Sequence, residues 1–249
     1  MKTLILAAGV GQRLGEIADN RPKCLLEFNG RSLLNRHLDI LRHYAISEII
    51  IVTGYEAGMI HEAVTQAAAG DIVRTVNNPE YLKGSHISLL AGLESLDSDE
   101  DFILMDADVL YDQRMIERLL QTEHNNCFLL DRDFIHGEEP VKLCIRDGNI
   151  VEFRKKIDPQ LGFDLQGESV GFFRFTAVTA TRLIRVTRDY LNQGKDQQPY
   201  EECIRDLLLE TPGDFGYEDV TGLRWIEIDF PEDVDRAKSD ILPNIMQIN

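Results

Sequence analysis

The chain has 249 residues, with 43 acidic and 26 basic side chains and a formal net charge of −17. Such a charge argues against non-specific nucleic-acid binding, and no apolar run reaches the roughly 18 residues that a membrane-spanning helix needs. Four widely spaced cysteines without a C-x-x-C pattern argue against zinc and predict buried, reduced thiols. We therefore expect a cytoplasmic protein without nucleic-acid or membrane partners.

Strand and helix patterns alternate along the first half of the chain. Short apolar runs predict strands at Thr3–Leu6, Glu48–Val52, Ile72–Val76 and Phe102–Met105. Helical patterns lie between or after them, at Leu33–His43, Gly58–Ala69, Ile87–Ser95 and Gln113–Gln121. This order predicts an α/β fold built on a doubly wound, mostly parallel sheet.

The pattern changes after residue 125. Strands are predicted at Cys127–Asp131, Val141–Arg146, Asn149–Phe153 and Gly171–Thr176. Two helices, Ala177–Asn192 and Tyr200–Glu210, precede a strand at Trp225–Asp229 and a last helix that begins at Pro231. Since no linker or repeat appears, residues 1–249 are expected to form a single domain with two parts, 1–125 and 126–249.

The loop after the first strand is the most informative segment. Its small residues include Gly9 and Gly11, which let backbone N–H groups approach a polyphosphate, and the cations Arg13 and Lys23 follow. A dinucleotide fingerprint would need a glycine at Leu14, and the P-loop pattern fails as well. The loop predicts a nucleoside-triphosphate site, with an ordinary strand-to-helix turn as the alternative.

The segment LAAGVGQRL, followed by PKCLL, resembles the opening of the nucleotidyltransferase superfamily that activates sugar phosphates and phospho-alcohols. That family has LAAGxGxRL followed by PKxLL. The short chain, the Tyr81–Leu93 segment and the WIEID strand are most similar to CTP-dependent cytidylyltransferases for phosphocholine, inositol 1-phosphate or aminoalkylphosphonates. The resemblance implies a Rossmann-like nucleotidyltransferase fold, in which residues 1–125 bind the nucleotide. Residues 126–249 would supply a small β-rich acceptor lobe and the last metal-site strand.

Two aspartates follow apolar strands, where ligands gather in open α/β sheets. Asp106 comes after Phe102–Met105, and Asp229 comes after an apolar-rich run that begins at Trp225. Mg²⁺ prefers carboxylate oxygens, and the resemblance implies that Asp106 and Asp229 hold this ion. A helix N-cap is the alternative for each, and Asp108 is a third metal candidate that we also assign to the acceptor.

A turn of small and polar residues at 77–88 leads into a predicted helix. Cytidylyltransferases contact the pyrimidine base through a similar turn. The resemblance implies base contacts there, with a helix cap as the alternative role of Ser85. The full set of predicted nucleotide-binding residues is Leu6, Ala7, Ala8, Gly9, Gly11, Arg13, Lys23, Asn78, Gly84, Ser85 and Ser88.

Residues 139–142, 154–156 and 167–172 fall where relatives place their acceptor lobe. Lys142 or Lys156 would hold the acceptor phosphate as a point charge, and Glu168 would bind a hydroxyl or amine. A solvated hairpin end is the alternative for the lysine at 156.

Trp225 could form an aromatic cage for a quaternary ammonium, with a core position as the alternative. Its partners in the cage would be Tyr81, Tyr111 or Tyr217. Asp131 and Asp133 are further residues that could reach the acceptor.

The reaction that the resemblance implies is transfer of CMP from CTP to a small phosphorylated or phosphonate acceptor, with release of pyrophosphate. Arg13 would hold the β- and γ-phosphates, Lys23 would bridge the α-phosphate and the incoming oxygen, and Mg²⁺ would neutralise charge. An acceptor oxyanion needs no general base. A UTP- or GTP-dependent sugar 1-phosphate transferase and a non-catalytic regulatory homologue are the alternatives, and the resemblance allows a homodimer.

Overall fold

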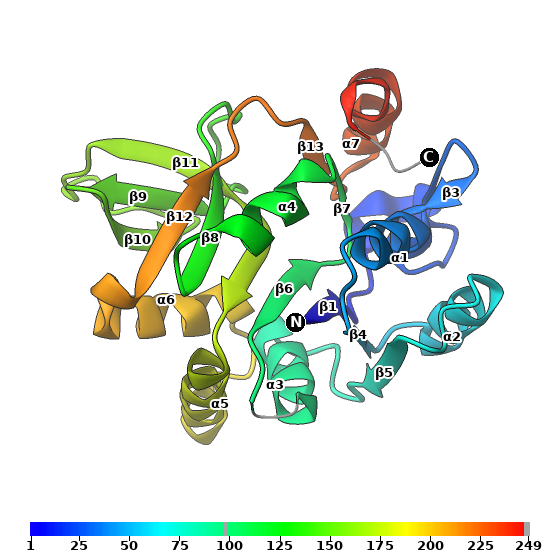
Figure 1. Ribbon diagram of the computed structural model, residues 1–249, viewed down its shortest axis with the longest axis horizontal. Coiled ribbons are helices and arrows are strands. Elements are labelled where there is room, and N and C mark those ends of the chain that lie inside the picture. Colours follow the sequence, from blue (N-terminus) through cyan, green and yellow to red (C-terminus); the bar gives the residue numbers. More distant parts are fainter. Residues whose placement is uncertain (97–98, 247–249) are drawn as a thin grey trace.

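The computed structural model describes residues 1–96 and 99–246, and a nine-stranded mixed sheet forms its centre (Figure 1). The main path of strands is β10-β9-β11-β6-β1-β4-β5, and β8 pairs with β11 and β12 beside it. The strands are β1 (Lys2–Ala7), β4 (Glu48–Thr53), β5 (Val73–Asn77), β6 (Phe102–Asp106), β8 (Asn126–Asp131), β9 (Lys142–Arg146), β10 (Asn149–Arg154), β11 (Leu165–Phe175) and β12 (Phe215–Asp219).

The four strands that the first half contributes to the main sheet are parallel. β1 lies between β4 and β6, and β4 pairs with β5, all in parallel register. β11 is antiparallel to β6, β8 and β9, so it joins the parallel half to the later strands. The predicted α/β fold is therefore confirmed, with the parallel pairing concentrated in the first half.

The predicted helices are confirmed. They are α1 (Leu33–His43), α2 (Ala57–Gln66), α3 (Ser85–Ser95), α4 (Arg114–Gln121), α5 (Ala177–Asn192), α6 (Tyr200–Glu210) and α7 (Pro231–Arg236). Hydroxyl caps explain two starts, because Ser32 accepts from the Asn35 amide at 3.1 Å and Thr176 accepts from the Thr179 amide at 3.2 Å. Pro231 occupies the first turn of α7, where a missing N–H costs nothing.

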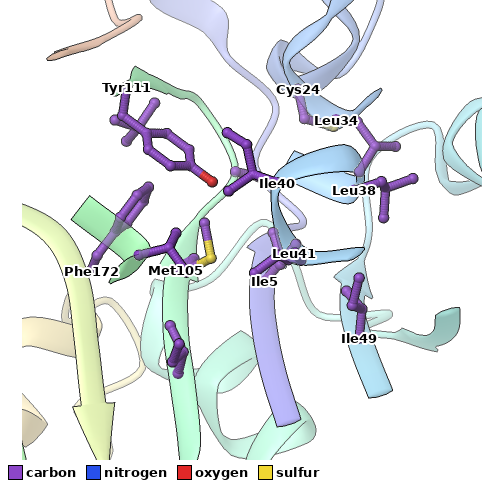
Figure 2. Packing of buried hydrophobic residues seen from close by; sticks show 14 of the residues in the cluster. Ile5, Cys24, Leu34, Leu38, Ile40, Leu41, Ile49, Met105, Tyr111 and Phe172 are labelled. Carbon is purple, nitrogen blue, oxygen red and sulfur yellow. The ribbon is translucent and has the colours of Figure 1, made fainter. Parts of the chain in front are cut away.

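Alternating residues of the central strands enter two hydrophobic cores on opposite faces of the sheet. Ile5 and Met105 face α1, where Leu38 and Leu41 pack against them (Figure 2). Leu4, with neighbours on β4 and β6, enters the core that α3, α5 and α6 cover. Covering both faces explains why these strands read as continuous apolar runs.

Several short strands differ from the sequence prediction. β7 (Val109–Tyr111) and β13 (Trp225–Glu227) pair antiparallel in a small sheet of their own, and β2 (Glu27–Phe28) pairs with β3 (Arg31–Ser32). The expectation that Asp229 follows a strand of the parallel sheet is wrong, because β13 pairs only with β7. β12 has no counterpart among the predicted strands, and β11 begins at Leu165 rather than at Gly171.

Cys24, Cys127, Cys144 and Cys203 are buried and free of disulfides, as predicted. Within residues 1–96 and 99–246, none of the helices combines the length and apolar character needed to cross a membrane.

Candidate active site

A cavity of about 380 Å³ opens where β1 ends. Its lining includes six of the predicted nucleotide-binding residues: Leu6, Ala7, Gly9, Gly11, Arg13 and Lys23. The predicted contact Ala8 is buried instead, and its carbonyl accepts a hydrogen bond from the Tyr55 amide at 3.1 Å. The glycine loop and both predicted cations thus share one cavity, and their contact with a nucleotide stays a prediction.

Gly11 lets the Lys23 side chain cross the loop. Its φ is +67°, and a Cβ atom there would lie only 2.8 Å from Cγ of Lys23. Glycine adopts this left-handed backbone without penalty and leaves room for the lysine methylenes. The second glycine of the motif therefore positions a cation, beyond opening the loop to a ligand.

Lys23 and Arg13 converge on Asp229. The Lys23 ammonium lies 2.8 Å from Oδ2 of Asp108 and 2.5 Å from Oδ1 of Asp229, and an Arg13 nitrogen lies 3.3 Å from Oδ2 of Asp229. Burial disfavours the charge on Lys23, but the two carboxylates outweigh it and raise the pKa of Lys23. Both predicted catalytic cations are therefore charged and held at one point.

Three carboxylates at this point could hold a metal ion. Each of Asp108, Glu227 and Asp229 offers an oxygen within 4.8 Å of the others. Glu227 is exposed within the cleft, where enclosure by protein and the charges of Asp108, Asp229 and Asp106 raise its pKa. Oxygen ligands with an excess of negative charge fit a hard divalent cation.

Asp106, the other predicted metal ligand, lies beside this group and outside it. Its Oδ2 accepts a hydrogen bond of 2.6 Å from the Tyr200 hydroxyl, and burial together with Asp108 and Glu201 raises its pKa. Gly171, with φ +80°, leaves the space that this carboxylate fills. Asp108 thus lies beside Asp229 in this arrangement, and the metal-binding role of Asp106 with Asp229 stays a prediction.

The predicted base-binding residues do not line the cavity. Asn78 donates a hydrogen bond of 2.9 Å to the Ser88 hydroxyl, and both side chains are buried. The Ser85 hydroxyl accepts from the Tyr200 amide at 2.9 Å, so it caps α6 rather than its own helix. A Cβ at Gly84 would collide with the Gln198 carbonyl.

Tyr81 and Leu82 are the members of this segment that line the cavity wall. Base contacts by Asn78, Gly84, Ser85 and Ser88 remain predictions.

A second cavity, of about 350 Å³, adjoins the first. Asp131, Glu168 and Trp225 line it together with Glu227 and Asp229, whereas Asp108 lines the first cavity. The carboxylate group therefore lies at the junction of two cavities, an arrangement suited to a reaction between two bound molecules.

The prediction that Lys142 binds an acceptor phosphate is wrong in this arrangement. Its side chain is buried, and the ammonium donates to three carbonyls, of Gly137 at 2.8 Å, Pro140 at 3.1 Å and Lys155 at 2.8 Å. All three donors are thus engaged. Lys156 is exposed with no ion pair among the described residues, and Lys155 pairs with Glu139 at 3.1 Å.

Trp225 and Glu168 both line the second cavity, and their contact with an acceptor stays a prediction. The Trp225 indole donates to Oδ2 of Asp131 at 2.8 Å, and Asp131 faces Glu168 across the β8–β11 pair. Burial, and then the charge of Asp131, raise the pKa of Glu168 to about 7. The carboxylates and the indole ring therefore form one wall of the second cavity.

The predicted cage of Trp225 with a tyrosine is wrong. Tyr81 lines the other cavity, Tyr111 is buried against Phe172, and Tyr217 lines a separate surface depression. The aromatic rings that share the second cavity with Trp225 belong to Phe134, Phe230 and His136.

One site residue, Glu227, was missed from the sequence, and one contact of Glu139, which lies in the segment predicted for the acceptor lobe, was not predicted. Glu227 precedes Asp229 by two positions, a spacing that puts both on one side of an extended segment, so the WIEID pattern held the signal. Glu139 accepts from Arg13 at 3.0 Å across 126 positions of the chain, and no local pattern indicates that contact.

Comparison with known proteins shows the family of the chain. The family model described as a MobA-like NTP transferase domain matches residues 3–150. The chain is similar to the CTP:phosphoglutamine cytidylyltransferase of Campylobacter jejuni, 24% identical over 254 residues, covering 94% of this chain and 98% of that one. It is also 28% identical to the bifunctional IPC transferase and DIPP synthase of Rubrobacter xylanophilus, covering 96% of this chain and 51% of that one.

Among solved structures, the inositol-1-phosphate CTP transferase of T. maritima aligns with a TM-score of 0.77 at 19% identity. The alignment covers 98% of this chain and 97% of that one. At this identity the likeness shows a shared nucleotidyltransferase fold.

Proposed function

Because the chain belongs to the family of MobA-like NTP transferase domains, we propose that it moves CMP from CTP to a small phospho-alcohol or phosphonate. An acceptor oxygen would form a bond to the α-phosphorus of CTP as the bond between the α-phosphorus and the bridging oxygen breaks. Pyrophosphate leaves with that oxygen. The observation that carries the proposal is the junction of two cavities at Asp108, Glu227 and Asp229, with Lys23 and Arg13 beside it.

Lys23 and Arg13 supply the positive charge. Lys23 lies in the nucleotide cavity with a raised pKa, so it stays protonated and offsets charge at the α-phosphate. The Arg13 guanidinium lies 5.1 Å from the centroid of the Phe230 ring. Because the side chain is half-exposed, the guanidinium can turn toward the β- and γ-phosphates. Exposed ion pairs such as Arg13–Glu139 are weak enough for a triphosphate to displace.

Mg²⁺ fits the three carboxylates of Asp108, Glu227 and Asp229, which offer only oxygen ligands and a surplus of negative charge. When bound there, the ion neutralises phosphate charge and lowers the barrier to transfer. Asp106, hydrogen-bonded to Tyr200, supports the turn that carries Asp108. A general base is unnecessary, because the acceptor phosphate or phosphonate is already an oxyanion at neutral pH.

Pyrophosphate release tests this function. CTP, UTP, GTP and ATP are each incubated with Mg²⁺ and phosphocholine, 2-aminoethylphosphonate, inositol 1-phosphate or glucose 1-phosphate. We expect release with CTP and one of the first three acceptors. Release only with UTP or GTP and glucose 1-phosphate would contradict the proposal in favour of a sugar 1-phosphate transferase. Nucleotide binding without release across the panel would favour a regulatory homologue.

A further inference from the structure

The second cavity, which the proposed function assigns to the acceptor, is strongly acidic. Eight aspartate and glutamate side chains line it, against one arginine, Arg236, and no lysine. Of the eight, Glu139 pairs with Arg13 and Lys155, Asp229 pairs with Lys23 and Arg13, and Glu227 belongs with Asp229 to the three-carboxylate group. Asp131 and Asp233 accept hydrogen bonds from neutral N–H groups, which leave their negative charge in place. A surplus of negative charge remains in the part of the cavity away from Asp229.

Glu168 is the centre of this surplus. Within the described part of the chain, its carboxylate forms neither a hydrogen bond nor an ion pair, although it is partly buried. Lys142 lies opposite it in the β9–β11 register but directs its ammonium to three carbonyls. Asp131, on the other side, adds a second negative charge. A partly buried carboxylate in such surroundings lacks a cationic partner, and the raised pKa of Glu168, about 7, agrees with that.

Trp225 supplies an aromatic surface beside the two carboxylates. Its indole N–H is fixed by Asp131, so the ring has one orientation at the cavity wall. An indole face attracts cations through its quadrupole, and it adds little affinity for a neutral hydroxyl. Carboxylates and an indole together therefore select positive charge.

The position of the acceptor follows from the chemistry of the transfer. Its phosphoryl oxygen must reach the junction at Asp229, Lys23 and Arg13, and the rest of the molecule then extends toward Glu168. We infer, resting on the proposed function, that the acceptor carries a positively charged nitrogen, an ammonium or alkylammonium group, bound by Glu168, Asp131 and Trp225. A neutral polyol phosphate would leave the charge of this wall unbalanced.

Matched acceptors that differ only in charge test the inference. We compare 2-aminoethylphosphonate with 2-hydroxyethylphosphonate, and phosphocholine with its neutral isostere 3,3-dimethylbutyl phosphate, with CTP and Mg²⁺. The expected kcat/KM favours the cationic member of at least one pair by about 10- to 100-fold, the range for a hydrogen bond or ion pair to a charged group. Equal use of both members in each pair would overturn the inference while leaving the transfer reaction standing.

Two variants locate the preference. Glu168→Gln is expected to reduce the cationic-to-neutral ratio by about tenfold or more, because it keeps the shape and removes the charge. Glu94→Gln is the matched control, since Glu94 pairs with Arg188 on the surface, outside both cavities. A ratio that stays at the wild-type value in both Glu168→Gln and Asp131→Asn would overturn the assignment to this wall.

Calorimetric binding of the two phosphonates separates this inference from the proposed function. If no pyrophosphate is released but 2-aminoethylphosphonate binds more tightly than the hydroxyl analogue, the charge selection holds and the transfer reaction fails. If the phosphonates bind equally and phosphocholine binds no better than its isostere, the inference is overturned, whatever the turnover.

Discussion

Lys23 is the residue on which the site depends. One ammonium lies within 2.8 Å of Asp108 and 2.5 Å of Asp229, two residues that are 121 positions apart in the sequence. Lys23 itself was predictable, because it belongs to the PKCLL segment that follows the glycine loop. The direction of a long side chain was not predictable. Lys142 illustrates this, since its ammonium donates to three backbone carbonyls and no sequence pattern indicates that contact.

Asp108 and Asp106 differ in what they contact, so their variants should differ. Asp108→Asn removes a charge from the three-carboxylate group and is expected to lower kcat by about 10²- to 10³-fold and to raise the Mg²⁺ concentration needed for half activity. Asp106→Asn keeps a hydrogen-bond acceptor for Tyr200, and its Mg²⁺ requirement should change less. Kinetic titration with Mg²⁺ checks this, and a larger shift in Asp106→Asn would favour the Asp106–Asp229 pair instead.

Glu168 should give acceptor binding a pH dependence. Its pKa of about 7 means that it is largely protonated below that pH and ionised above it, in the field of Asp131 on β8, Lys142 on β9, Lys155 after β10 and Arg236 on α7. A cationic acceptor such as 2-aminoethylphosphonate is expected to bind more tightly as the pH rises through about 7. Its Michaelis constant, measured between pH 6 and 8 in wild type and Glu168→Gln, checks this. The same pH profile in both proteins would contradict the role of this carboxylate.

At the scale of elements, long apolar runs were easier to predict than short strands. β1, β4 and β6 are buried on both faces, so their sequences are continuous apolar runs that predict a buried strand. β7 and β13 have three residues each and form a separate pair, too short to give a periodic signal. Because β13 carries Glu227 and leads to Asp229, the part of the site that was misplaced is the part built on a strand of three residues.

The glycine loop should tolerate a change at Gly9 better than at Gly11. Gly11→Ala introduces a Cβ at φ +67° and 2.8 Å from the Lys23 side chain, whereas a Cβ at Gly9 meets nothing within 4 Å. We expect Gly11→Ala to destabilise the substrate-free protein by about 1–2 kcal/mol and Gly9→Ala to change it by less than about 0.5 kcal/mol. Urea unfolding without nucleotide checks this, and equal losses would contradict the packing described here.

Helix α1 should make the fold sensitive to acid through His37. Burial lowers the pKa of His37 to about 4, and the ring stacks on Tyr111 while one nitrogen bonds the Ala107 carbonyl at 3.0 Å. The unfolded chain protonates this histidine near pH 6.5, so stability is expected to fall as the pH drops from about 6.5 to 4, by up to about 3 kcal/mol.

The His37→Gln variant isolates this effect. It should be less stable than wild type at pH 7 but should lose less stability on acidification, as measured by urea unfolding at pH 7, 5.5 and 4.5. Parallel losses in both proteins would assign the acid sensitivity to other groups.

At the scale of the molecule, the two halves share one sheet. β11 pairs with β6 of the parallel half and with β8 and β9 of the later strands, so one strand joins the two halves, and its Glu168 lines the second cavity. The single-domain prediction for residues 1–249 is consistent with this continuity and remains a proposal. The net charge of −17 repels anionic substrates, so their binding depends on the cations at the junction, which supply positive charge locally.

The most direct test of the central claim is detection of the transfer product itself. Wild type and the Asp229→Asn variant are incubated with CTP, Mg²⁺ and 2-aminoethylphosphonate or phosphocholine, and ³¹P NMR follows the phosphorus resonances. We expect wild type to form a new P–O–P linkage between CMP and one acceptor together with pyrophosphate, and the variant to slow this by about 100-fold or more. CTP that stays intact with each acceptor, or equal rates in both proteins, would contradict the assignment of the reaction to this junction.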